Sequence, residues 1–179
     1  MLSIDVVPEG ATTSNANADT AYSSIMADLT DPGQVYAALA GCTAVVHMAA
    51  WANAGMVTDP RTFNDNTSAT FNIMQAAADL GIKRVISASS NQLYGFAGAP
   101  PEFVPVTEAH PPRPVNSYAL SKLVGEQTAE YFTRTRGLEV LSFRIMGNTP
   151  SNIYMPSNMP QSRGKWKHFG DAYMFLGQI

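Results

Sequence analysis

Three short runs of apolar residues alternate with stretches of helical periodicity, and this alternation limits the possible fold more than any other feature of the sequence. The runs cover 44–50, 84–90 and 138–144, and the helical stretches between them cover 63–80 and 113–137. The runs read as strands buried on both faces, as in parallel sheets. We therefore predict an α/β fold with a parallel sheet. Its expected buried strand residues are Val45, Val46, Val85, Ile86, Val140 and Leu141.

The flanking parts of the chain give weaker signals. Short strands are expected within 1–7 and 22–26, and a helix over 32–39 that Thr30 or Asp31 can cap. From Met146 onward several prolines, asparagines and serines break the pattern, and only 171–179 hints at another helix. We expect one main domain over 1–145 and the start of a second, irregular region over 146–179.

The charge of the chain excludes several classes of partner. The 179 residues have a formal net charge of -3, and the 11 basic residues form no run. Nucleic acids and anionic membranes attract clustered positive charge, so neither is an expected partner. A hydrophobic share of 45% with only 14% charged residues indicates a folded domain with a buried core.

The cysteine count and the hydropathy of the chain indicate its cellular compartment, and the spacing of its histidines argues against a metal centre. Cys42 is the single cysteine, so no intramolecular disulfide can form. His47, His110 and His168 lack the spacing of metal ligands, and no metal site is predicted. No apolar stretch approaches about 18 residues, and the first ten residues lack the basic and apolar regions of a signal peptide. A cytoplasmic location is expected.

Tyr118 and Lys122 are the first candidates for chemistry. They lie four residues apart on the helix expected within 113–137, so both side chains project from one face. A nearby ammonium favours the phenolate and would lower the pKa of Tyr118 towards the range of a general acid or base. A separate apolar stripe through Leu120, Val124 and Tyr131 is expected to pack. Alone the pair is weak evidence, because a chain with 7 tyrosines has roughly one chance in three of showing it by accident.

Several motifs together strengthen that reading. In chain order they are DVVP, ADLTD, VVHMAA, the helix with Asn66, SASSNQLYG, SYALSK and FRIMGNTP. This series resembles the extended short-chain dehydrogenase/reductases, that is, the NAD-dependent epimerase/dehydratase family. The SSN sequence, the PRP before the Tyr118 helix and the late Trp166 look most like the uronate dehydrogenases within it. The resemblance implies a Rossmann-like, doubly wound parallel sheet.

The resemblance also implies catalytic roles. Tyr118 would exchange a proton with the substrate hydroxyl, and Lys122 would lower the Tyr118 pKa while holding the nicotinamide ribose. Ser90 would donate a hydrogen bond to the reacting oxygen. Asn91 and Arg163 would contact a sugar or uronate substrate. Read without the resemblance, Ser89 and Ser90 cap a strand end and Asn91 forms a turn.

The cofactor implied by the resemblance is NAD. Asp5 would accept the adenosine ribose hydroxyls, which favours NAD over NADP because a 2′-phosphate would be repelled. Asp28 and Leu29 would contact the adenine. The remaining expected cofactor contacts are Met48, Ala49, Ala50, Asn66, Ser89, Tyr118 and Lys122.

One departure from the family is large. The chain contains no G-x-G-x-x-G, the loop that brings backbone amides and a helix N-terminus to the pyrophosphate. We expect that the first strand, glycine loop and first helix are missing, roughly thirty residues on the length of such a unit. Most of the C-terminal substrate-binding part is also expected to be missing.

Three functions stay open at this point. The first is an NAD-dependent oxidoreductase acting on a sugar or uronate, and the second is a sugar-nucleotide epimerase or dehydratase. The third is a catalytically inactive chain that keeps the fold and binds no cofactor. The sequence alone also leaves open whether the chain forms a homo-oligomer.

Overall fold

The computed structural model describes residues 3–4, 24–146 and 176–178. From β2 to β5 the elements alternate between strands and helices, as the sequence predicts. They are β1 (Ser3–Ile4), β2 (Ser24–Ile25), α1 (Pro32–Leu39), β3 (Ala44–His47), α2 (Asp59–Asp79), β4 (Arg84–Ser90), the 3-10 helix η1 (Asn91–Tyr94), α3 (Ser117–Arg136), β5 (Glu139–Ile145) and β6 (Leu176–Gln178).

The main sheet has the strand order β3-β4-β5-β6. The pairs β3–β4 and β4–β5 are parallel, which confirms the parallel α/β prediction. The pair β5–β6 is antiparallel. Residues 176–178 are therefore a strand, and the helix expected over 171–179 is wrong at these positions. Strands β1 and β2 form a separate parallel pair.

The helix ends follow the capping residues in the sequence. The Asp31 side chain accepts hydrogen bonds from the backbone N–H groups of Gly33 and Gln34 at the start of α1. Asn116 accepts one from Ala119 at the start of α3, and Gly137 ends that helix with a φ of 67°. Both local arrangements satisfy backbone groups that a helix end leaves without a partner. Helix α2 begins at Asp59, four residues before the expected start.

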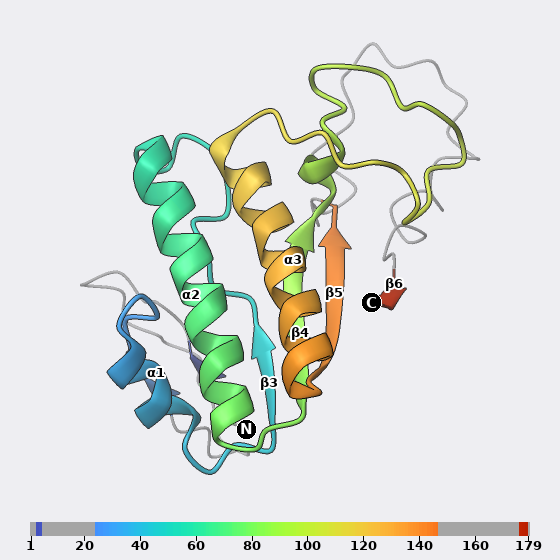
Figure 1. The fold of residues 1–179 in the computed structure, drawn as a ribbon. Helices are drawn as coiled ribbons and strands as arrows, with labels where there is room; N and C mark the ends of the chain where they lie inside the picture. The colour runs from blue at the N-terminus through green and yellow to red at the C-terminus, as the bar shows by residue number, and fades with distance from the viewer. Residues whose placement is uncertain (1–2, 5–23, 147–175, 179) are drawn as a thin grey trace, which may run out of the picture.

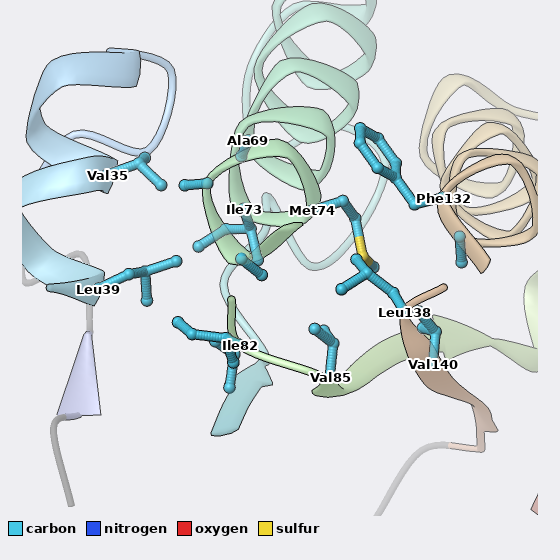
Figure 2. Close-up of a cluster of buried hydrophobic side chains, with 14 of the residues drawn as sticks. Val35, Leu39, Ala69, Ile73, Met74, Ile82, Val85, Phe132, Leu138 and Val140 are labelled. Atoms are coloured by element: carbon cyan, nitrogen blue, oxygen red, sulfur yellow. The ribbon is translucent and has the colours of Figure 1, made fainter. Parts of the chain in front are cut away.

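Helices α2 and α3 lie side by side on one face of the sheet, with α1 beside α2 (Figure 1). Between them and the strands lies a cluster of buried side chains (Figure 2). Helix α1 supplies Val35 and Leu39, and Phe132 comes from α3. The other members include Ile73, Met74, Ile82, Val85, Leu138 and Val140.

Only alternate residues of each strand meet this core. Val45, Val85 and Val140 are buried as expected, but Val46 is 56% exposed, Ile86 is 36% exposed and Leu141 is half-buried. The expectation of burial on both faces is therefore wrong for Val46 and Ile86. Successive side chains of a strand point to opposite faces. No helix of the described ranges covers the face to which these two residues point.

The packing face of α3 is the reverse of the one expected. Leu120 and Tyr131 of the apolar stripe are exposed, whereas Tyr118, Lys122 and Phe132 are buried. The buried face lies against α2 and the strands. The helix itself was therefore predicted correctly, but the side of it that packs was not. Polar side chains with partners on β4 occupy the buried side.

Candidate active site

The carboxyl end of β4 forms the floor of the site. Ser89 and Ser90 end this strand and are both buried. The Ser90 hydroxyl accepts a hydrogen bond from the backbone N–H of Gln92, 3.2 Å away, and so caps η1. Asn91 is half-buried in the first position of η1. Both the capping role and the strand-end position follow from local sequence.

Tyr118 meets Ser90 from the first turn of α3. Burial raises the pKa of Tyr118 above its ordinary value near 10, and a hydrogen bond with the Ser90 side chain opposes this shift. The Ser90 and Tyr118 side chains therefore lie near each other on one side of the sheet. Ser121, which the sequence did not single out, fixes this turn by donating to the Tyr118 carbonyl oxygen at 2.7 Å.

Lys122 reaches the same strand end from one turn further along α3. Its side-chain nitrogen Nζ donates to the Ala88 carbonyl oxygen at 2.8 Å and lies 5.7 Å from the centre of the Tyr118 ring. Burial lowers the pKa of Lys122 to about 8. The expected lowering of the Tyr118 pKa by this ammonium is not found, because burial dominates the Tyr118 pKa and the ammonium faces the strand.

His47 supports the site from β3. Its Nε2 atom lies 3.2 Å from the Thr70 hydroxyl oxygen, and that hydroxyl donates to the Asn66 carbonyl oxygen at 2.9 Å. Nε2 of a neutral His47 is therefore the donor in this contact. Burial, with a smaller contribution from the Lys122 charge, lowers the His47 pKa to about 3. His47 is thus a buried histidine with a hydrogen-bond partner.

Asn66 connects the loop after β3 to α3. Its side-chain oxygen accepts from the Trp51 backbone N–H at 2.8 Å. Its Nδ2 donates to the Trp51 carbonyl oxygen at 3.2 Å and to the Ser121 hydroxyl at 3.1 Å. Both amide hydrogens are thus engaged within the protein. In this structure Asn66 holds the frame of the site and offers no hydrogen to a cofactor.

Two charged residues that the sequence gave no role lie beside Ser89. The Ser89 hydroxyl donates to Glu126 at 2.6 Å. Arg144 on β5 donates to both oxygens of the same carboxylate, at 2.9 and 2.8 Å. Ser89, expected as a cofactor contact, is therefore engaged with α3. Only the strand register could have indicated this contact, because it places Arg144 opposite Ser89 on the neighbouring strand.

The residues expected to contact the adenine and other parts of the cofactor lie around the end of β3. Met48 is exposed, Ala49 and Ala50 are half-buried, and the side chain of Leu29 packs in the core. The Asp28 carboxylate accepts from the backbone N–H and the hydroxyl of Thr30, at 2.9 and 2.7 Å. Asp5 and Arg163 lie outside the described residues.

A small cavity of about 30 Å³ is lined in part by Leu29, Met48 and Ala49. That volume holds a water molecule but not a nucleobase.

The residues present fit one end of NAD better than the other. Lys122 carries three donors and uses one on Ala88, which leaves two for ribose hydroxyls. The Ser90 and Tyr118 hydroxyls lie beside it and can meet a reacting oxygen. For the pyrophosphate the sequence has no glycine-rich loop.

The described residues hold no group of three or more histidine, cysteine or acidic side chains suited to a metal ion. No helix among them is long and apolar enough to span a membrane.

Comparison with curated proteins finds sugar enzymes. The chain is 35% identical to the L-arabinose 1-dehydrogenase (NAD(P)(+)) of Haloferax volcanii, over 68% of this chain and 51% of that protein. It is 33% identical to the uronate dehydrogenase of Pseudomonas syringae, over 83% of this chain and 50% of that protein. A UDP-glucose 4-epimerase of Streptococcus mutans is 25% identical. The chain thus spans about half the length of these relatives.

Solved structures agree with this picture. The glucuronic acid dehydrogenase of Chromohalobacter salexigens superposes with a TM-score of 0.69 at 26% identity, over 83% of this chain and 52% of that one. A short-chain dehydrogenase/reductase superfamily protein of Agrobacterium tumefaciens with bound NAD gives 0.66 at 30% identity, over 79% and 40%. The model of the NAD dependent epimerase/dehydratase family matches residues 3–169. The chain belongs to the NAD-dependent epimerase/dehydratase family.

Proposed function

We propose that this chain carries the catalytic face of an NAD-dependent oxidoreductase that acts on a sugar or uronate. The observation that supports this most is the buried pair of Ser90 and Tyr118 hydroxyls, with Lys122 one helical turn away, at the carboxyl end of β4. Ligands of open α/β sheets bind at this edge. Two of the similar curated proteins are dehydrogenases of L-arabinose and of uronate.

Tyr118 would handle the proton of the reaction. Oxidation of a sugar hydroxyl removes a proton from oxygen and a hydride from carbon, and NAD supplies the acceptor for the hydride. The phenolate oxygen of Tyr118 would take the proton while the Ser90 hydroxyl hydrogen-bonds the same substrate oxygen. In the reverse direction the neutral phenol would return the proton. General acid or base catalysis of this kind is worth about 10²- to 10⁴-fold.

The raised Tyr118 pKa predicts a direction of pH dependence. At neutral pH the phenol is protonated, which suits reduction of a carbonyl group. Oxidation requires the phenolate, so its rate should rise as the pH increases towards the Tyr118 pKa. The ammonium of Lys122 gives little help above its pKa of about 8, since it is then mostly neutral. A rate of oxidation that falls between pH 7 and 9 would contradict this role.

The direct test compares the chain with its Tyr118→Phe variant. Formation of NADH is followed with a panel of uronates and aldoses, and NAD binding is measured by calorimetry. We expect Tyr118→Phe to lose about 10²- to 10⁴-fold in turnover and to keep its NAD affinity. Tyr131→Phe, an exposed tyrosine on the same helix, is the matched control. Equal turnover of Tyr118→Phe and the parent chain would make Tyr118 a packing residue.

A second candidate function is a chain that binds no cofactor. The observation in its favour is that the sequence lacks a G-x-G-x-x-G, the motif that brings backbone amides to the pyrophosphate. We expect NAD to bind more weakly than micromolar for this reason. No binding at millimolar NAD, together with no turnover, would place this candidate first. Turnover of UDP-sugars without net NADH would instead favour an epimerase.

A further inference from the structure

One ridge of α3 contacts the last three residues of β4. Tyr118, Lys122 and Glu126 are spaced four apart, so they lie one above the other on a single face. The Ser90 side chain lies close enough to Tyr118 to lower its pKa, and Lys122 donates to the Ala88 carbonyl oxygen. Glu126 accepts from the Ser89 hydroxyl at 2.6 Å. The contact between Glu126 and Ser89 therefore holds the same end of β4 that Tyr118 and Lys122 contact.

The Glu126 carboxylate is itself held from β5. Arg144 binds both of its oxygens, and the side chains of Arg144 and Glu126 are only 16% and 12% exposed. Arg144 lies opposite Ser89 in the strand register. Such a two-point bond between planar groups fixes orientation as well as distance. The pair thus sets both the height and the rotation of α3 above β4.

Arg144 also reaches the segment between η1 and α3. Its Nη1 donates to the Tyr94 hydroxyl at 2.9 Å and to the Glu108 carbonyl oxygen at 3.2 Å. The guanidinium carbon lies 5.0 Å from the centre of the Tyr94 ring. One guanidinium therefore joins β5, α3, the end of η1 and the chain that leads into Tyr118.

We propose that Arg144 and Glu126 are positioning residues that hold the Ser90, Tyr118 and Lys122 side chains in register for proton transfer. The catalytic part of this statement rests on the proposed function. Among the described residues, neither Arg144 nor Glu126 forms a hydrogen bond with Ser90 or with the Tyr118 hydroxyl. They act through Ser89 and through the shared face of α3. Displacements of about 1 Å at a reacting centre can cost about 100-fold in rate.

A second ion pair on α3 gives a matched control. Arg136 pairs with Asp79 of α2 at the far end of the helix, where their side chains are 40% and 34% exposed. It is also an arginine–carboxylate contact on α3, but it lies far along the helix from Tyr118. Arg136→Lys should therefore leave the site unchanged.

The first readout needs no activity. Tyrosine rings are labelled with carbon-13, and the Tyr118 signal is assigned from Tyr118→Phe. We expect Arg144→Lys and Glu126→Gln to shift this signal and to move its titration towards the ordinary pKa of tyrosine, by about half a pH unit or more. Arg136→Lys should do neither. A Tyr118 signal unchanged in folded Arg144→Lys and Glu126→Gln would overturn the proposal.

The second readout divides turnover from binding. On the best substrate of the panel, we expect Arg144→Lys to lower kcat about 10- to 100-fold and to change the KM for NAD by less than about twofold. An unchanged kcat would overturn the positioning role while the proposed function stands. If the parent chain shows no turnover but the Tyr118 signal moves as expected, the proposed function fails and the positioning role stands.

A milder variant protects the test against misfolding. Ser89→Ala removes one hydroxyl and no charge, so it breaks the link between Glu126 and β4 and keeps the ion pair. If Arg144→Lys or Glu126→Gln does not fold, Ser89→Ala carries the same two readouts. A Tyr118 signal and a kcat equal to those of the parent would then refute the proposal.

Discussion

The two ends of the layer formed by α2, α3 and β4 differ in what they bury. At the amino end of β4 the buried side chains are apolar, as for Val85, Met74 and Phe132. At its carboxyl end several buried side chains are polar, as for Ser90, Asn66 and Lys122. The helices run against the strands, so the first halves of α2 and α3 meet the carboxyl end (Figure 1).

Because of this difference, the amino end of β4 is expected to contribute most to stability, and the carboxyl end holds the polar groups of the candidate site. Apolar burial stabilises the fold at about 25 cal/mol per Å², whereas buried polar groups cost free energy unless they are paired. Each polar side chain named above has a partner within the protein. The carboxyl end therefore contributes less stability and offers the groups that a substrate needs. Substitutions at the two ends should have opposite consequences.

The largest effect is expected at the apolar end. Phe132 is fully buried and packs edge-to-face with Phe71 at a ring distance of 5.5 Å. Phe132→Ala should lower the free energy of unfolding by about 3–5 kcal/mol, through lost burial and the cavity left behind. Urea unfolding measures this, with exposed Tyr131→Ala as the control. A loss below about 1 kcal/mol would show that the apolar end does not dominate stability.

At the polar end a substitution should instead stabilise the chain. Burial lowers the Lys122 pKa from 10.5 to about 8, so the charged form is disfavoured by about 3 kcal/mol. Lys122→Met should raise the free energy of unfolding at pH 7 by at most that amount, because the Ala88 carbonyl loses its donor. Exposed Lys83→Met is the control.

The sign of the Lys122 effect follows from its two pKa values. Between about 8 and 10.5 the unfolded chain holds more protons on Lys122 than the folded chain, so parent stability rises with pH. The advantage of Lys122→Met should therefore shrink across this window. An advantage that grows above pH 8 would contradict a buried, charged lysine.

His47 should make the polar end sensitive to acid. Its folded pKa of about 3 lies below the ordinary 6.5, so its contribution to stability is complete above pH 6.5 and is lost as the pH falls towards 3. Between pH 7 and 5 the expected loss is about 2 kcal/mol. His47→Gln should flatten this part of the stability profile. An unchanged slope would mean that other groups cause the acid response.

The smallest effect is expected at the cap of α3. Asn116 accepts from the Ala119 backbone N–H at 2.7 Å, two residues before Tyr118 in the chain. Asn116→Ala should cost about 1 kcal/mol of stability, and Asn116→Ser should restore most of it because serine also caps. Thermal unfolding of the three proteins measures both steps. Equal stability of the alanine and serine variants would remove capping as the cause.

Local patterns in the sequence predicted the elements well. Helix α1 and strand β4 have the expected bounds, Asp31 caps α1, and Gly137 ends α3. Each of these depends on residues that are neighbours in the chain. The pairing of Tyr118 with Lys122 on one face also followed, because helix geometry fixes that relation.

The sequence did not predict which side of an element would be buried. Leu120 and Val46 belong to apolar patterns and are exposed, whereas Lys122 is buried. It also gave no role to Arg144 or Glu126, whose contact joins residues 18 positions apart. Motif matching named Ser89 and Asn66 as cofactor contacts, but their partners lie on other elements.

The sequence by itself determined the parallel α/β fold, the order of strands and helices from β2 to β5, and the position of Tyr118 and Lys122 on one face of a helix. The tertiary structure alone decided the pKa directions of Tyr118 and Lys122, because burial depends on what packs above a residue. It likewise decided that Arg144 meets Glu126, since strand register and helix height are set by the packed layer as a whole.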